Sequence, residues 1–321
     1  MKNTVLITGA AGFIGYHIAK RLLKENYVVI GYDNLNNYYS VDIKKDRIRE
    51  LNKNEGFIYV KGSLEDYRKL EETFMKYKPE IVINLAAQAG VRFSIENPRA
   101  YIDSNLVGFF NILQCCRDFP INHLIYASSS AVYGDNREVP NCENDNSDKP
   151  VSLYAATKKS EELMAYSYCK LYGVKASGLR FFTVYGPNGR PDMAYYQFAK
   201  KIKNGETIEV YNNGEIFRDF TYIDDVVEAV FRLLNRVPNK DENDTYHKIY
   251  NVGSGAPHSV NDMIELLEKY IGKKALRKNL PMQKGDMFLN YAKTEELEKV
   301  IGYKPTVTFA EGLKRFVEWL K

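Results

Sequence analysis

Long apolar runs are missing from this sequence. No apolar stretch approaches the ~20 residues that a membrane-spanning helix requires, so we expect no membrane partner. The first residues lead directly into a strand-like segment at Thr4, without the charged lead and apolar core of a secretory signal. Together these absences predict a cytoplasmic protein.

Cysteine is also scarce, and the charges nearly balance. The four cysteines form no Cys-x-x-Cys pair and lie in no cluster with zinc-ligand spacing, which predicts free thiols in a reducing compartment and no metal site. The 45 Lys and Arg residues are interspersed with 41 Asp and Glu residues, which leaves a formal charge of +4. Because a nucleic-acid-binding surface needs clustered basic residues, we expect no nucleic-acid partner.

The first half of the chain does contain a regular alternation of short apolar runs and longer amphipathic stretches. The apolar runs predict strands at 4–7, 27–32, 57–61, 81–85, 123–127 and 175–181. The longer stretches predict helices ending near Lys24 and spanning 70–77, 101–117 and 154–172. This alternation is typical of the α/β class, and we predict a doubly wound parallel sheet of the Rossmann type.

The pattern changes near residue 185. Beyond that point, helical stretches at 195–203, 225–235, 260–270 and 310–321 are separated by irregular segments. The length of 321 residues also exceeds the usual size of one core, about 100–200 residues. We therefore expect a Rossmann domain over 1–185 and a smaller mixed α/β domain over 186–321. The boundary is soft, since the chain can cross back.

A glycine-rich segment, GAAGFIG, follows the first predicted strand and opens the next helix. Gly9 permits a tight turn, Gly12 lets the backbone approach a pyrophosphate, and Gly15 permits close packing of helix on strand. The N–H groups at a helix start favour phosphate there. Asp33 ends the second strand, where a carboxylate can bind ribose hydroxyls, and Asn34 follows it without an arginine to accept a 2′-phosphate. These residues predict NAD rather than NADP as the cofactor.

A tyrosine, a lysine and a serine cluster form a second group. Tyr154 and Lys158 are four residues apart at the start of a predicted helix, so their side chains share one face. Three serines, 128–130, follow the fifth predicted strand, and the carboxyl ends of such strands meet at the ligand crevice. A phenol, with an ordinary pKa of about 10, is a weak base at neutral pH, but a nearby ammonium stabilises its phenolate. The group predicts removal of a proton from a secondary alcohol whose carbon loses hydride.

Several motifs occur in the order seen in the extended short-chain dehydrogenase/reductase superfamily: GAAGFIG, NLAAQAGVR, SSSAVYG, YAATK, LRFFTVYGP, GRPDMA and RDFTYIDDV. Within that superfamily the chain resembles the UDP-glucuronate 4-epimerases over essentially its whole length, and GRPDMA after TVYGP is the most family-specific segment. The resemblance implies an NAD-dependent nucleotide-sugar epimerase. It implies Tyr154 as the base, Lys158 as its partner and Ser129 as the catalytic serine.

The resemblance also implies which residues bind the cofactor and the UDP-sugar. Cofactor contacts are expected from Gly9, Gly12, Phe13, Ile14, Gly15, Asp33, Asn34, Ser63, Leu64, Leu85, Ala86, Ala87 and Lys158. Substrate contacts are expected from Arg92, Ser130, Thr183, Arg190, Gln197, Tyr211, Arg218 and Asp286. Among the substrate residues, Arg218 is assigned to the diphosphate, Asp286 to the ribose, and Gln197 and Tyr211 to the uracil pocket.

The chain departs from its relatives at a few positions. Ser63 stands where many relatives carry an Asp that contacts adenine, so the adenine contact is expected to be weaker. Thr183 and Gln283 stand where UDP-glucose 4-epimerases carry Asn and Arg, which points away from UDP-glucose.

Four reactions are open to a sugar oxidised at C4. Dehydratases and decarboxylases of the superfamily carry a carboxylate beside the catalytic serine, whereas SSSAVYG places Ala131 there. Simple oxidation would release NADH, and epimerisation needs only that the keto sugar turn over and take hydride back on its other face. We therefore predict interconversion of UDP-glucuronate and UDP-galacturonate. A UDP-hexose or UDP-N-acetylhexosamine 4-epimerase is the alternative, a UDP-glucuronate decarboxylase is less favoured, and an idle NAD-binding regulator is disfavoured by the intact Tyr, Lys and Ser.

A uronate substrate needs its carboxylate held, because a 4-keto uronate is a β-keto acid that loses CO2. We hypothesise that Ser130, Thr183 and Arg190 hold the carboxylate region, with help from Arg92, since the forked donors of arginine suit a carboxylate. The predicted helices 101–117 and 154–172 carry apolar stripes. The corresponding helices pair in dimers of this superfamily, so the resemblance implies a homodimer. Packing of these stripes inside one chain is the alternative.

Overall fold

The structure of the protein is a computed structural model that describes residues 3–136, 138–282 and 287–321. It divides into two compact units. Unit 1 comprises Met1–Asn136, Asn146–Arg180 and Val227–Tyr250, and unit 2 comprises Arg137–Asp145, Phe181–Val226 and Asn251–Lys321. The sequence predicts a division near residue 185. In the structure two segments lie on the other side of that division: Arg137–Asp145 belongs to unit 2 and Val227–Tyr250 to unit 1. The second segment returns because β10 (His247–Val252) lies at one end of the sheet of unit 1.

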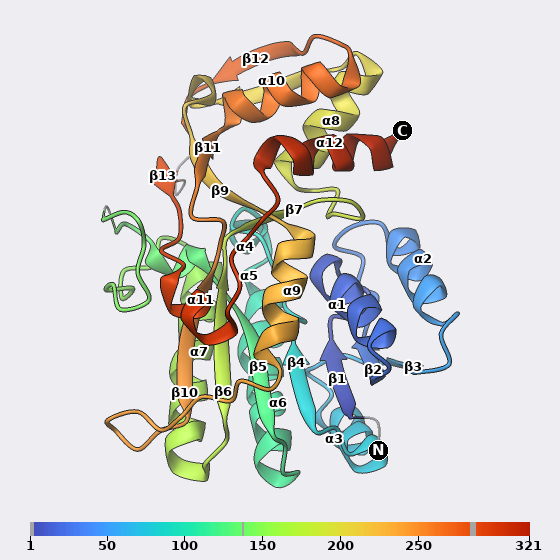
Figure 1. Ribbon diagram of the computed structural model, residues 1–321, viewed down its shortest axis with the longest axis vertical. Helices are drawn as coiled ribbons and strands as arrows, with labels where there is room; N and C mark the ends of the chain where they lie inside the picture. The colour runs from blue at the N-terminus through green and yellow to red at the C-terminus, as the bar shows by residue number, and fades with distance from the viewer. Residues whose placement is uncertain (1–2, 137, 283–286) are drawn as a thin grey trace. The chain divides into compact units, whose positions relative to one another are not determined.

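Unit 1 is built on a seven-stranded sheet in the order β10-β6-β5-β4-β1-β2-β3 (Figure 1). Its other strands are β1 (Thr4–Thr8), β2 (Val28–Asp33), β3 (Phe57–Lys61), β4 (Ile81–Asn84), β5 (His123–Ser129) and β6 (Ala176–Phe181). The pairs β1–β2, β2–β3, β1–β4 and β4–β5 are parallel. Nearly continuous burial of β1, β4 and β6 explains their unbroken apolar runs, since both faces of the sheet are covered. The predicted α/β class and Rossmann topology are confirmed.

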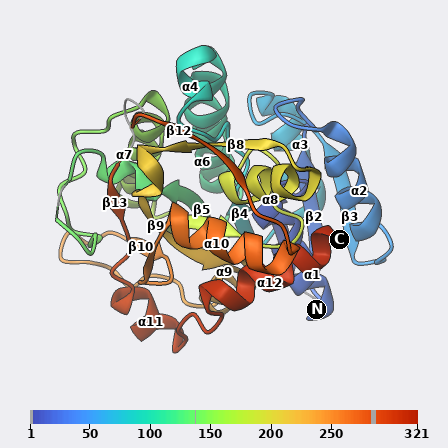
Figure 2. The ribbon, with the colours of Figure 1, turned by 90° about the horizontal axis from the view of Figure 1, so that it is seen from above.

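Helices cover both faces of this sheet (Figure 2). They are α1 (Phe13–Lys24), α2 (Val41–Leu51), α3 (Tyr67–Tyr77), α4 (Phe93–Glu96), α5 (Pro98–Tyr101), α6 (Gly108–Asp118) and α7 (Leu153–Tyr172). Helices α3, α6 and α7 lie on one face and enclose an apolar core with Leu6, Val82 and Leu124 of the sheet. Helix α1 lies on the other face beside α9 (Ile223–Leu233), to which Arg21 is tied by an ion pair with Glu228.

The predicted helix 101–117 is not uniform. The chain forms α5, then a π-helix, η1 (Ile102–Val107), and then α6. The π-helical turn carries Asn105, whose buried side chain bonds both the backbone N–H and the carbonyl of Gln88. Its amide also donates to Thr157 Oγ1 at 3.0 Å, which links η1 to α7. Such turns are uncommon and gather near functional sites.

Unit 2 contains smaller sheets covered by helices. Strand β9 (Phe217–Tyr222) pairs with β7 (Thr183–Tyr185), β11 (Pro257–Ser259) and β13 (Leu289–Asn290), and β8 (Thr207–Tyr211) pairs with β12 (Leu276–Leu280). The helices are α8 (Ala194–Asn204), α10 (Val260–Ile271), α11 (Glu295–Ile301) and α12 (Phe309–Leu320). Tyr185 lies at the centre of an aromatic cluster with Tyr195, Phe220, Tyr222 and Phe309. In the described part of the chain, no helix has the length and apolar character needed to cross a bilayer.

Candidate active site

The glycine-rich turn joins β1 to α1 and accepts no larger residue. Gly9 has a φ of +71°, and a Cβ there would lie 2.8 Å from the backbone nitrogen of Ala86. A Cβ on Gly12 would lie 2.9 Å from the Gly9 carbonyl oxygen, and one on Gly15 would lie 2.2 Å from it. Helix α1 begins at Phe13, with no side-chain hydrogen bond capping its first N–H groups. Bare backbone and a helix N-terminus therefore form a cradle suited to a pyrophosphate.

Asp33 lies beside this turn, at the end of β2. Its carboxylate is buried and accepts hydrogen bonds from the backbone N–H groups of Ala11 (3.0 Å) and Leu35 (2.8 Å). Burial raises the pKa of Asp33, and these hydrogen bonds and the charges of Lys44 and Arg47 oppose that rise. Each carboxylate oxygen can still accept a further hydrogen bond. Asp33 is therefore fixed in place while retaining capacity for ribose hydroxyls.

Two further predicted cofactor segments lie against the same edge of the sheet. The Asn34 amide donates to Ser63 Oγ at 3.0 Å, which joins the ends of β2 and β3. Leu64 follows directly and is buried. After β4, the N–H of Ala86 donates to Thr8 Oγ1 at 3.1 Å, and that of Leu85 donates to the Thr8 carbonyl at 3.2 Å. The structure thus brings the predicted NAD residues from four segments together, and the residues present fit that cofactor.

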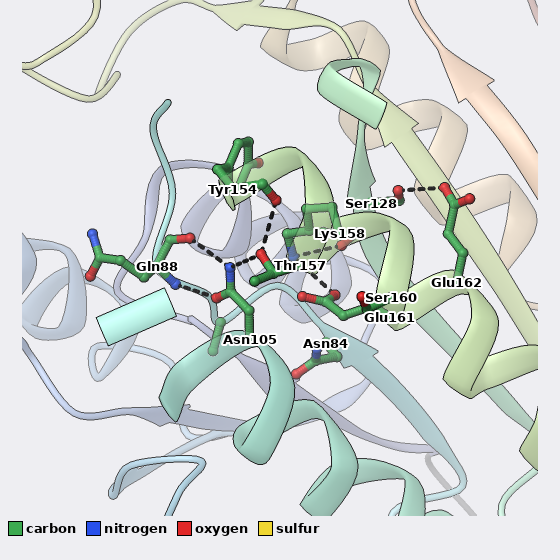
Figure 3. Close-up of polar contacts among 12 residues, drawn as sticks. Asn84, Gln88, Asn105, Ser128, Tyr154, Thr157, Lys158, Ser160, Glu161 and Glu162 are labelled. Carbon is green, nitrogen blue, oxygen red and sulfur yellow. Dashed lines mark hydrogen bonds and ion pairs between the residues drawn. The ribbon is translucent and has the colours of Figure 1, made fainter. Parts of the chain in front are cut away.

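The catalytic pair predicted from the sequence lies at the start of α7 (Figure 3). Ser152 caps this helix by accepting a hydrogen bond from the N–H of Ala155. Tyr154 lies in the first turn, half-buried, with its ring edge-on to Tyr101 at 6.0 Å between centroids. Lys158, one turn further, is buried, and its Nζ donates to the Ala127 carbonyl at 2.9 Å.

The three serines at 128–130 differ in their hydrogen-bond partners. Ser129 ends β5, and its Oγ accepts from the N–H of Ala131, which caps a short 3-10 turn, η2 (Ser130–Tyr133). Ser130 is half-buried and opens that turn. Ser128 is buried and donates to Glu162 Oε1 at 2.6 Å. Because Lys158 is bonded to Ala127, two residues before Ser129, the lysine is attached to the strand that presents the serine.

Two neighbouring carboxylates, Glu161 and Glu162, were not predicted from the sequence. Arg180 of β6 donates to both oxygens of Glu162, at 2.9 and 2.8 Å. Burial alone would raise the pKa of Glu162, but the bonds from Arg180 and Ser128 hold it below its usual value. Glu161 accepts a 3.0 Å bond from Lys158, and burial raises its pKa to about 7. The only sequence signal is a pair of acids one turn beyond Lys158.

The remaining predicted substrate residues lie on several different elements of the chain. Arg92 is exposed at the start of α4 in unit 1. In unit 2, Arg190 forms two bonds to the carboxylate of Asp192, at 3.1 and 2.5 Å, and Gln197 donates to the Asp192 carbonyl. Thr183 begins β7 and Arg218 lies on the neighbouring strand β9, whereas Tyr211 ends β8, which belongs to the other sheet. Asp286 lies outside the described residues.

A glycine-rich turn, a buried carboxylate at the end of β2, and a Tyr–Lys pair whose lysine is bonded to the strand that ends in a serine define the class of protein. The model of the NAD dependent epimerase/dehydratase family matches residues 5–253, and the chain belongs to that family. It is 51% identical to protein CapI of Staphylococcus aureus, over 98% of this chain and 97% of that one. It is 47% identical to the probable UDP-glucuronate 4-epimerase of Rhizobium meliloti, over 98% of this chain and 96% of that one.

A solved structure shows the same fold. The UDP-glucuronic acid 4-epimerase of Bacillus cereus, in complex with UDP-glucuronic acid and NAD, superposes with a TM-score of 0.91 at 30% identity. The match covers 99% of this chain and 98% of that one. The predicted resemblance to the UDP-glucuronate 4-epimerases is confirmed, as is NAD as the cofactor of the family.

Proposed function

We propose that the protein interconverts UDP-glucuronate and UDP-galacturonate by transient oxidation at C4. The names of its relatives and of its structural neighbour support this substrate. The observation that carries the chemistry is the anchoring of Lys158. Its ammonium is held on the β5 strand that ends in Ser129, and it lies one helical turn from Tyr154.

NAD would be held by the segments that meet at the edge of the sheet. The glycine turn and the N-terminus of α1, with Phe13 and Ile14, would hold the pyrophosphate, and Asp33 would hold the adenosine ribose. Asn34, Ser63 and Leu64 would line the adenine side, with Leu85, Ala86 and Ala87 along the dinucleotide. When bound, NAD accepts a hydride from C4 and returns it to the opposite face of the sugar.

The protein's own groups manage the proton. Tyr154 would take the proton of the C4 hydroxyl as the carbon is oxidised and give it back as the carbonyl is reduced. The Lys158 ammonium would stabilise the phenolate, and Ser129 would donate a hydrogen bond to the substrate oxygen. No net oxidation results, because the proton and the hydride both return to the sugar.

The other predicted substrate residues would hold the rest of the sugar nucleotide. Ser130, Thr183, Arg190 and Arg92 would hold the uronate carboxylate, which must be kept from cleavage while C4 is a ketone. Arg190 is already fixed by Asp192, so its fork is oriented before substrate binds. Arg218 would contact the diphosphate, Gln197 and Tyr211 the uracil, and Asp286 the ribose.

The test is conversion of UDP-glucuronate by the purified protein without added NAD, followed by NMR of the sugar. We expect UDP-galacturonate to form, with no accumulation of NADH absorbance at 340 nm. The Tyr154→Phe variant is the control and should lose roughly 10²–10⁴ of kcat while keeping its fold. An unimpaired Tyr154→Phe variant, or a decarboxylated product, would refute the proposal.

The carboxylate assignment has its own test. Arg190→Ala should reduce kcat/KM for UDP-glucuronate by roughly 100-fold, because a charge-assisted contact with the substrate carboxylate is lost. Any turnover of UDP-glucose should fall much less. Equal losses on the two substrates would show that Arg190 does not distinguish the uronate.

We also propose a homodimer in the cytoplasm. Large apolar side chains are exposed on η1 and α6 (Val107, Phe110) and on α7 (Leu163, Leu171, Tyr172). Pairing these helices with those of a second copy would cover them. Four free cysteines suit a reducing compartment. Light scattering should give about twice the monomer mass, and Leu163→Glu should shift it toward the monomer.

A further inference from the structure

Glu161 is a buried acid that the proposed reaction does not use. Its Oε2 lies 3.0 Å from Lys158 Nζ, and the two side chains are only 1% and 3% exposed (Figure 3). The other carboxylate oxygen, Oε1, is buried and has no hydrogen-bond partner within the part of the chain that the structure describes. One full donor for two buried oxygens leaves the ionised form poorly stabilised.

The groups around Glu161 make its charge easy to change. On its own helix it faces the Lys158 ammonium and the carboxylate of Glu162. From β5 the fully buried phenol of Tyr126 lies close enough to be influenced by both glutamates. Arg180 of β6 is engaged by Glu162, so its charge is already neutralised there. Lys158 is therefore the one cation that bonds Glu161 in the described residues.

We propose that Glu161 is a positioning residue that holds the Lys158 ammonium and, through its own protonation, sets how strongly that ammonium acts on Tyr154. This inference rests on the proposed epimerase function. As a neutral acid, Glu161 leaves the field of the ammonium on the phenol unopposed. As a carboxylate 3.0 Å from Nζ, it offsets much of that field, so the ammonium acts less strongly on the Tyr154 phenol.

The geometry therefore predicts a coupled titration. The pKa of Glu161 is raised to about 7 by burial, which places its charge change near neutral pH. As pH rises, ionisation of Glu161 places a negative charge beside the Lys158 ammonium and weakens the effect of that ammonium on Tyr154. The dependence of kcat on pH therefore contains the charge change of Glu161 in addition to that of the reaction itself.

The test compares the pH dependence of kcat and KM for wild type and Glu161→Gln, both as holoenzyme with UDP-glucuronate. Glutamine keeps an oxygen that can accept the Lys158 bond but carries no charge. For Glu161→Gln we expect kcat to reach half of its maximum at a pH about one unit lower than for wild type. The increase of kcat with pH should span a narrower pH interval, and KM should change little. Glu161→Asp, which restores the charge, should return the profile toward that of wild type.

The outcomes separate this inference from the function on which it rests. If wild type does not convert UDP-glucuronate, the proposed function fails. If wild type is active and Glu161→Gln lowers kcat equally at every pH, Glu161 is only structural and the inference is refuted. If Glu161→Gln does not fold, as judged by circular dichroism, Glu161→Asn is measured by the same criterion. A wild-type profile that fits a single titration also refutes the inference.

Discussion

Glu161 and Glu162 are adjacent on α7, chemically identical and both nearly inaccessible, yet their surroundings favour opposite charge states. Glu162 receives two bonds from Arg180 and one from Ser128, and its pKa is held below the usual value. Glu161 receives one bond from Lys158, and burial raises its pKa to about 7. The difference teaches that the number of donors, rather than burial, decides whether a buried acid stays ionised.

The largest expected effect comes from removing the partner of Glu162. Arg180→Met would leave a buried carboxylate with the Ser128 hydroxyl and a Lys159 ammonium 3.9 Å away, and we expect a loss of about 3–5 kcal/mol in the free energy of unfolding. The double variant Arg180→Met, Glu162→Met should recover much of that loss, because no uncompensated charge remains. Urea unfolding measures both. A double variant as unstable as the single one would contradict the comparison.

The next effect is a difference between Glu161 and Glu162 in how their contributions to stability depend on pH. The lowered pKa of Glu162 adds stability above its unfolded pKa, and that stability is lost as pH falls through the folded value. The raised pKa of Glu161 works oppositely: its stabilising effect is complete below the unfolded pKa and is lost as pH rises toward about 7.

Thermal unfolding at pH 3, pH 5 and pH 8 tests this contrast. Between pH 5 and pH 8 the stability of Glu161→Gln relative to wild type should increase, by about 1.4 kcal/mol for each unit of pKa shift. Glu162→Gln should be less stable than wild type at pH 5 and pH 8, and this difference should shrink toward pH 3. Parallel pH dependence in the two variants would show that the neighbours do not differ.

The smallest expected effect concerns Ser128. Ser128→Ala removes one donor to Glu162 and should cost about 1 kcal/mol of stability. Turnover should change less than about twofold, since Oγ of Ser128 bonds Glu162. Ser129→Ala, the matched control, should cost a similar ~1 kcal/mol of stability, because Ser129 caps η2, but should lower kcat roughly 100-fold. Equal loss of activity in the two variants would remove the distinction between the serines.

The sheet and the first turn of unit 1 were predictable because their signals are local. Buried parallel strands appear as short apolar runs, and the glycine segment lies directly between a strand and a helix. Helix α2 was missed because VDIKKDRIREL is largely charged, although Lys44 and Arg47 within it are buried. Glu161 and Glu162 were missed for the same reason, since charged residues are normally exposed.

Unit 2 was less predictable because its strands depend on distant partners. Helices α8, α10 and α12 were predicted within two residues, since each has a clear apolar face. Its strands are two to six residues long and pair across many intervening residues, so no local pattern marks them. The substrate residues of unit 2 were assigned only through the resemblance to a family, and their roles stay predictions.

The return of the chain at β10 has a consequence for synthesis on the ribosome. Strand β6, at 176–181, lies between β5 and β10 in the sheet, and β10 is made some 70 residues later. Until then the nascent sheet has an open edge of unpaired backbone, which is prone to pair with other chains. We therefore expect a polypeptide that stops at residue 185 to aggregate, and the Rossmann unit to be completed only after residue 252 has emerged.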